Sequence, residues 1–276
     1  MPNIDEIRNF VTEGYRNILK RDPDESGLNH HVGLISSGRL TREKFLEALR
    51  LCEEYRNRHI IAEEISKCTD IRYITVVNNL DVFNRNLSQS LGINKDNINI
   101  IDNIFENRPI SQRYNEMIRQ LLKDPKQEWL AFCHQDFYIG EDLSKRLYNL
   151  NKNCIYGPIG MSYSTIALGK IIEINYPVGK ECDGCVIDTL DAMCMIVYKD
   201  TIKKYNLLFD ERFRFHFYVE DFCAQISTIG IPTKTLQMIC RHMSAGNTNS
   251  SDFINARDNL IRKWGIIWTT TGIHKT

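Results

Sequence analysis

Three polar residues, His134, Gln135 and Asp136, follow directly after the short apolar run Trp129–Cys133. The run is rich in aromatic residues and predicts a strand buried on both faces of a sheet. A polar triplet cannot continue such a strand, and ligands of open α/β sheets bind just beyond the carboxyl ends of strands. The triplet is therefore either a strand-end turn or a binding site, and we favour the binding site.

The cysteines offer a second kind of chemistry. There are nine, an odd number at irregular spacing, and several lie inside apolar runs, which predicts reduced, mostly buried thiols. Cys182 and Cys185 form a CxxC pair that could be half of a zinc site or a redox pair. No second CxxC or histidine pair stands at zinc spacing, so we do not expect a metal or redox role for this pair.

Length and charge exclude several classes of partner. The 276 residues suggest one large domain or two unequal ones. Lys+Arg and Asp+Glu are both 35, so no general attraction to nucleic acid or to an acidic membrane surface is expected. No transmembrane-length apolar run is present, and the start lacks the pattern of a signal peptide. We therefore expect a soluble, cytoplasmic protein without a transmembrane segment.

Residues 1–66 are predicted to form an all-α module. Apolar residues recur at helical spacing over the first twenty positions, and further helices are expected over 28–37 and from Thr41, its N-cap. Asp22 and Asp24 resemble the start of a calcium loop, but its twelfth position is Gly33 rather than glutamate, so a capped turn is favoured. Residues 63–70 are predicted to end a helix and begin a linker.

The same segment resembles a small helical domain of unknown function, found in bacterial extracellular and polysaccharide-making proteins. The motif that carries the resemblance runs from Tyr15 through Pro23 to Gly27, with Gly38 and Tyr55 following it. We predict that this module docks on a protein partner.

Residues 71–268 are predicted to form an α/β domain. Strands are expected over 71–77, 97–101 and 129–133, alternating with helices over 81–91 and 111–122, an order that favours a parallel, nucleotide-binding sheet. A further strand over 193–198 and a closing helix over 251–264 follow. Residues 162–186 are expected to be an irregular, mobile loop over the binding site, and residues 269–276 to be frayed.

An ordered set of short motifs in this domain resembles the family-2-type glycosyltransferases of the GT-A fold. One branch of bacterial glycosyltransferase-like proteins has His-Gln-Asp where the family carries its Asp-x-Asp motif. The residues that carry the resemblance are Asn78, Asn79, Arg85–Leu91, Arg113–Asn115, Phe132–Asp136, Asp188–Ala192, Phe209–Phe213, His216–Cys223, Gly230 and Arg241–Gly246.

This resemblance implies a nucleotide-diphosphate sugar as donor and a divalent metal, Mn²⁺ or Mg²⁺, that neutralises the leaving diphosphate. Asp136 is the implied metal ligand and His242 a second one, although His242 could equally be a hydrogen-bonded residue at a strand end. His134 departs from the usual carboxylate. The residues implied to contact the donor nucleotide are Asn78, Asn79, Arg113, Asn115, His134 and Gln135.

An inverting transfer also needs a general base for the acceptor hydroxyl. Asp221 and Glu220 are the candidates, with Asp221 slightly preferred by its spacing to Gly230. Both lie at a helix start, where a carboxylate is also favoured simply by the free amides and the helix dipole. Asp191 is expected to contact the acceptor or the sugar, or alternatively to form the turn before the next strand.

The resemblance thus implies a metal-dependent, inverting glycosyltransferase that acts on a glycan or lipid-linked acceptor in bacterial surface-polysaccharide synthesis. One alternative is a non-catalytic, glycosyltransferase-like protein that binds nucleotide or glycan, because the Asp-x-Asp motif is reduced and Val219 replaces an often acidic position. A nucleotidyltransferase is a weaker alternative, because no glycine-rich basic loop follows the first predicted strand.

Overall fold

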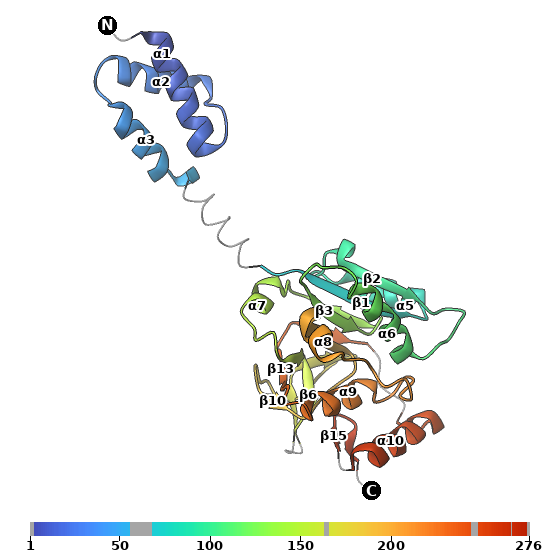
Figure 1. Cartoon of the computed structure of the whole chain (residues 1–276). Coiled ribbons are helices and arrows are strands. Elements are labelled where there is room, and N and C mark those ends of the chain that lie inside the picture. The colour runs from blue at the N-terminus through green and yellow to red at the C-terminus, as the bar shows by residue number, and fades with distance from the viewer. Residues whose placement is uncertain (1–2, 56–67, 163–165, 244–247, 266, 275–276) are drawn as a thin grey trace. The chain divides into compact units, whose positions relative to one another are not determined.

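The computed structural model describes residues 3–55, 68–162, 166–243, 248–265 and 267–274. The chain divides into two compact units, Met1–Cys68 and Thr69–Thr276 (Figure 1). Most of the helix end and linker predicted at 63–70 falls outside the described residues. Independent folding of the predicted domains, residues 1–66 and 71–268, stays a prediction.

The first unit consists of helices packed around a small apolar core. Its elements are α1 (Ile4–Gly14), the π-helical turn η1 (Tyr15–Leu19), α2 (Glu25–Ser36) and α3 (Arg42–Leu51). Thr41 caps α3 as predicted, by accepting a hydrogen bond from Lys44 N. Asp24 accepts from Gly27 N and caps α2, so the segment predicted as a capped turn is one.

A seven-stranded sheet forms the centre of the second unit, in the order β10-β13-β5-β12-β3-β1-β2. β1 lies parallel to β2 and β3, whereas β12 is antiparallel to β3 and β5. The sheet is therefore mixed, and the predicted parallel order holds for its first three strands. The bounds are β1 Ile71–Val77, β2 Ile98–Asp102, β3 Trp129–Cys133, β5 Ile155–Gly157, β10 Val186–Ile187, β12 Cys194–Tyr198 and β13 Thr233–Thr235.

Three smaller sheets contain the remaining strands. The four-stranded sheet has the order β4-β14-β8-β9 and the three-stranded sheet the order β11-β6-β7, while β15 pairs with β16. The bounds are β4 Phe137–Ile139, β6 Ile159–Met161, β7 Ala167–Gly169, β8 Ile171–Glu173, β9 Tyr176–Val178, β11 Thr189–Leu190, β14 Cys240–His242, β15 Ile267–Thr269 and β16 Gly272–His274.

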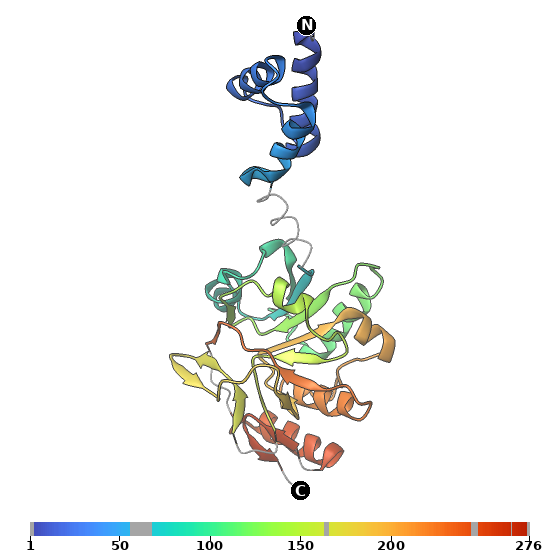
Figure 2. The same cartoon turned by 90° about the vertical axis from the view of Figure 1, so that its left-hand side faces the viewer.

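Two sequence predictions are wrong in this region. Residues 162–186 were expected to be irregular but contain β7, β8 and β9, the yellow strands in Figure 2. The end of the chain was expected to fray but forms the β15–β16 hairpin. Strands of three residues are too short to produce a readable alternation of apolar and polar positions, so no pattern announced them.

Helices and the smaller sheets cover the two faces of the central sheet. Residues of α6 (Ile110–Leu121), α8 (Lys199–Tyr205), α9 (Tyr218–Ser227) and α10 (Ser251–Trp264) join one core. The other core takes in α5 (Leu80–Arg85), α7 (Ser144–Tyr148), β4, β8 and β14. The helix predicted over 81–91 is shorter than expected, and two 3₁₀ turns follow it, η2 (Leu87–Gln89) and η3 (Lys95–Asn97).

β3 lies at the centre of this arrangement and is buried over its whole length. Trp129, Ala131 and Cys133 pack into one core, whereas Leu130 and Phe132 pack into the other. The alternation follows from the two-residue period of a strand that has a packed layer on each side. The predicted α/β class, with an all-α N-terminal part, is confirmed.

One cysteine prediction is wrong as well. Cys182 and Cys185 are joined in a disulfide, where reduced thiols were expected. Among the described residues the other cysteines are free, and most of them are buried as predicted. The disulfide spans two intervening residues of the loop that leads into β10, so it constrains only a local turn.

A buried group of charged side chains lies at the amino end of β3. Glu128 and Lys199 are 1% and 3% exposed, with Lys199 Nζ 3.5 Å from Glu128 Oε1. Arg72 Nε lies 3.1 Å from the same carboxylate. Glu128→Gln leaves two cations without their countercharge, so we expect the free energy of unfolding to fall by about 3 kcal/mol in urea titrations.

Asp70→Asn serves as the control, because its 3.4 Å ion pair with Lys126 is exposed on both sides. That change should cost less than about 1 kcal/mol. Equal losses of stability for the two variants would contradict the structural role of Glu128.

The separation into two units predicts that the second folds without the first. A protein that begins at Ser66 should remain soluble and show cooperative thermal unfolding, because the described residues of the sheet unit form apolar cores of their own. Circular dichroism during heating is the measurement. An insoluble product, or one without a cooperative transition, would refute the predicted domain division.

Candidate functional site

Several polar side chains meet at one edge of the central sheet. The carboxyl ends of β1 and β3 reach this edge, and antiparallel β12 begins there. After β3 the chain turns through residues 134–136 into β4, which pairs with β14 so that Phe137 faces His242. Met243 N donates to Asp136 O across this junction. The turn after β3 and the end of β14 are thereby held side by side.

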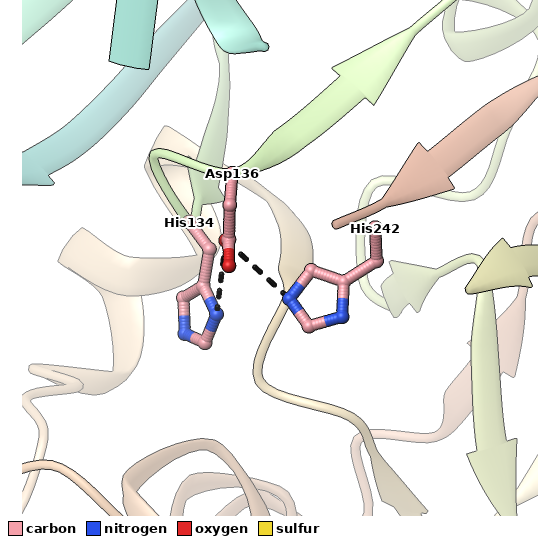
Figure 3. A group of neighbouring side chains, drawn as sticks. All are labelled: His134, Asp136 and His242. Carbon is pink, nitrogen blue, oxygen red and sulfur yellow. Dashed lines mark ion pairs between the residues drawn. The ribbon is translucent and has the colours of Figure 1, made fainter. Parts of the chain in front are cut away.

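His134, Asp136 and His242 form a compact group at this junction (Figure 3). Asp136 Oδ1 lies 3.4 Å from His242 Nε2 and 4.0 Å from His134 Nδ1. All three side chains are mostly buried, with 18% of His134, 13% of Asp136 and 8% of His242 exposed. One potential ligand atom from each residue lies within 4.8 Å of the other two.

The donor set fits a divalent metal ion. Ligands bound at about 2.0–2.2 Å stand roughly 3 Å apart around one ion, so a small inward movement of the side chains would suffice. Two imidazoles and one carboxylate suit first-row transition ions, whereas Mg²⁺ and Ca²⁺ take oxygen ligands. The group therefore suits a divalent first-row transition ion better than Mg²⁺ or Ca²⁺.

The pKa values of the two histidines are shifted in opposite directions. Burial lowers the pKa of His134, and the neighbouring His242 and His216 act in the same direction against Asp136 and Asp191. His134 is therefore neutral at pH 7, the state in which imidazole binds a metal. Burial also lowers the pKa of His242, but hydrogen bonding and charge from Asp136, with Asp191 and Glu173, outweigh burial and raise it.

Gln135 joins the turn after β3 to the end of β1. Its Oε1 accepts hydrogen bonds from Asn78 N at 3.1 Å and Asn79 N at 3.0 Å, and its amide nitrogen donates to Asn78 Oδ1. Asn79 Oδ1 accepts from Val82 N and caps α5. The three residues lie together at the predicted edge, while their contacts to a nucleotide stay predictions.

Arg113 and Asn115 of α6 have structural partners. Arg113 Nη2 donates to Asp102 O at the end of β2, and Nη1 lies 3.1 Å from Glu116 Oε2. Asn115 is 1% exposed and exchanges hydrogen bonds with the backbone of Phe209. Asn115 thus ties α6 to the loop before α9, and its expected nucleotide contact is not part of the site proposed below.

The two adjacent acids of α9 lie in different surroundings. Asp221 Oδ1 accepts from Trp264 Nε1 and pairs with Lys263 Nζ, both at 2.7 Å, so α10 holds this carboxylate. Among the described residues no cation pairs with Glu220, and its buried Oε2 has no hydrogen-bond partner. Burial and then the charge of Asp191 raise the pKa of Glu220 to about 8.

Both carboxylate oxygens of Asp191 accept hydrogen bonds from nearby residues. Its Oδ1 accepts from Met193 N at 3.1 Å, and its Oδ2 accepts from Thr270 Oγ1 at 2.6 Å. The turn before β12 that was the alternative for Asp191 is therefore present. The charge of Asp191 also acts on His134, His242 and Glu220, so the carboxylate is a neighbour of both the histidine group and the buried acid.

Three features of the site had no signal in the sequence. Glu173 Oε1 lies 3.7 Å from His242 Nδ1, from a segment expected to be irregular. Thr270 comes from a tail expected to fray. Phe217, directly before α9, has a φ of 62°, which is rare for a bulky residue and is typical of functional sites.

Known proteins resemble parts of this chain. Residues 5–59 match the family model described as "Domain of unknown function (DUF4214)", in agreement with the predicted helical module. No curated protein matches the sequence.

Solved structures similar to the chain include GalNAc-T7 with UDP, GalNAc and Mn²⁺, at 7% identity and a TM-score of 0.47, covering 71% of this chain and 48% of that one. Two structures of TarS from S. aureus have 12% identity and TM-scores of 0.45 and 0.44. Each match covers 70% of this chain, together with 39% of the first TarS chain and 65% of the second. The chain thus spans less than two thirds of the length of each of these structures.

Proposed function

We propose that the second unit is a metal-dependent glycosyltransferase that transfers a sugar from a nucleotide-diphosphate donor to an acceptor hydroxyl. The observation that carries the proposal is the convergence of the resemblance motifs. Residues from the ends of β1 and β3, the start of β12 and the end of β14 gather at one sheet edge around His134, Asp136 and His242. A binding site of an α/β sheet is expected at such an edge.

The metal would be held by His134 Nδ1, Asp136 Oδ1 and His242 Nε2, the three atoms that face one another. When bound, a divalent ion offsets the negative charge that grows on a diphosphate leaving group, an effect worth several kcal/mol at the transition state. The ends of β1 and β2, with Asn78, Asn79 and Arg113, would receive the nucleotide. These assignments rest on the family resemblance and on the donor set.

We propose Glu220 as the general base, whereas the spacing to Gly230 slightly favoured Asp221. A base must accept a proton, and Glu220 Oε2 has no hydrogen-bond partner among the described residues. Asp221 instead carries the Lys263 and Trp264 contacts and would hold α9 against α10. Asp191, whose charge acts on Glu220 and both histidines, would orient the acceptor between them.

The finer assignments are proposals of the same kind. Inverting stereochemistry, a glycan or lipid-linked acceptor, a bacterial surface-polysaccharide setting, a cytoplasmic location and a docking role for the helical module all rest on sequence resemblance or composition. No helix in the described parts of the chain has the length and apolar character that crossing a bilayer requires. The alternative of a non-catalytic binding protein shares the metal site but needs no base.

Asp136→Asn tests the metal site. The amide is a poorer ligand and carries no charge, so Mn²⁺-dependent binding of UDP in calorimetry should weaken at least about tenfold, the loss typical when a metal site is weakened. The melting temperature of the metal-free protein should change little. Asp200→Asn, at an exposed carboxylate in the first turn of α8, is the matched control and should bind as the parent does. Equal UDP affinity with Mn²⁺ and with excess chelator would overturn the metal role.

Glu220→Gln tests the base and separates an enzyme from a binding protein. The transfer rate should fall roughly 10²–10⁴-fold, whereas Asp221→Asn should act mainly through stability. In the parent, kcat/KM should rise with pH through about 8, because Glu220 must lose its proton before it can accept another. A glutamine variant that transfers sugar at the parent rate would exclude Glu220 and leave Asp221 and Asp191.

The same variant should change how stability depends on pH. The folded pKa of Glu220 is raised from 4.5 to about 8, so folding takes up a proton between these values. This group's stabilising contribution is complete below pH 4.5 and is lost as pH rises toward 8. The melting temperature of Glu220→Gln, relative to the parent, should therefore increase from pH 5 to pH 8.5.

A further inference from the structure

Tyr218 connects the histidine group to the start of α9. It is the first residue of that helix and is fully buried, and its ring packs against those of Tyr114 and Phe209. Its hydroxyl lies 2.9 Å from His134 Nε2 and 3.3 Å from the carbonyl oxygen of Ala192. The other ring nitrogen of His134, Nδ1, faces Asp136 (Figure 3).

The chemistry of these partners sets the direction of the hydrogen bonds. A carbonyl oxygen can only accept, and a tyrosine hydroxyl has one proton to donate. If that proton goes to Ala192 O, the hydroxyl oxygen accepts from His134, which must then carry its proton on Nε2. Neutral imidazole has one such proton, so Nδ1 keeps its lone pair on the side of Asp136.

The opposite arrangement leaves more groups without partners. If the hydroxyl donated to His134 Nε2, the His134 proton would sit on Nδ1, 4.0 Å from Asp136 Oδ1 and beyond hydrogen-bond distance. Ala192 O would lose its hydroxyl donor as well. A tyrosine hydroxyl carries one proton at neutral pH, which is the proton that this relay requires.

We propose that Tyr218 is a positioning residue that fixes His134 in the Nε2–H tautomer and so keeps Nδ1 available as a metal ligand. The ligand part rests on the proposed function, whereas the tautomer part stands on the hydrogen bonds alone. His242 presents the opposite nitrogen, Nε2, to Asp136, while its Nδ1 lies toward the carboxylate of Glu173. In metal sites, a group that hydrogen-bonds to the other ring nitrogen of a metal-binding histidine commonly fixes the orientation of the ring and its tautomer.

Tyr218→Phe separates this role from packing. The phenylalanine ring keeps the contacts with Tyr114 and Phe209 but removes the only atom that accepts from His134 Nε2 in the proposed relay. His134 should then populate the Nδ1–H tautomer, in which a proton occupies the position of the metal. Mn²⁺ affinity should fall by about 10–100-fold, the usual effect of losing such a partner.

Tyr156→Phe is the matched control. Tyr156 is 3% exposed, and its hydroxyl likewise donates to a backbone carbonyl, Asn151 O, at 3.1 Å. Among the described residues it makes no hydrogen bond or ring contact with His134, Asp136 or His242, so its loss should leave Mn²⁺ affinity unchanged. Both variants lose one buried hydroxyl, and their melting temperatures report how much of any effect is general destabilisation.

The experiment combines two measurements on the full chain. Calorimetry with MnCl₂ gives the metal affinity of the parent and the two variants. Long-range ¹H–¹⁵N NMR spectra of the metal-free proteins, with the His134 signals assigned from His134→Gln, give the tautomer directly. We expect Nε2–H in the parent and in Tyr156→Phe, and a mixture or the Nδ1–H form in Tyr218→Phe.

Two results would overturn the inference: an Nδ1–H tautomer of His134 in the metal-free parent, or an unchanged tautomer and Mn²⁺ affinity in Tyr218→Phe. A parent that binds no Mn²⁺ would instead overturn the metal site of the proposed function. The NMR measurement still decides in that case whether Tyr218 sets the tautomer. The failure of one proposal is thus distinguishable from the failure of the other.

Discussion

The site depends on the hydrogen-bonded position of β3 between β1 and β12. All five of its residues pair with β12 and the first four pair with β1, and His134 N continues the ladder by donating to Met193 O. A strand with packed layers on both faces must stop where its residues become polar, so the turn at His134–Asp136 can lie only at the sheet edge. β4 leaves from this turn and brings β14, with His242, to the same point. The histidine group is therefore a consequence of how one buried strand ends.

Long, strongly patterned elements were predictable from the sequence. β1 and β3 have the predicted bounds, and so has α10, because an apolar run or a clear helical period encodes each of them locally. The gathering of Asn78, His134 and Asp136 was also predictable, since carboxyl ends of neighbouring parallel strands share an edge. The three-residue strands β7–β9 and the β15–β16 hairpin were not predicted, because such short strands are stabilised by their pairing partners and not by a pattern of their own.

The contacts that the site residues make could not be predicted from the sequence either. Lys263 lies 42 positions after Asp221, and Thr270 lies far beyond Asp191, so no spacing rule relates them. Adjacent acids at a helix start look alike in sequence, yet successive helical residues point about 100° apart. Asp221 therefore meets α10 while Glu220 lies within the field of Asp191. Burial raises the pKa of both acids, but Lys263 and Trp264 oppose this rise at Asp221 whereas the charge of Asp191 adds to it at Glu220.

The first turn of α9 joins all of these parts. Tyr218 reaches His134, Glu220 is a neighbour of Asp191, and Asp221 is bound by α10, so three elements are coupled through four consecutive residues. The left-handed backbone of Phe217, with a φ of 62°, sets where this turn begins, at a cost of about 1–3 kcal/mol for a bulky residue. A right-handed residue there would extend the helix backwards and change the path by which the chain enters α9. The strained residue thus stands directly before Tyr218 and Glu220, at the point where the chain enters α9.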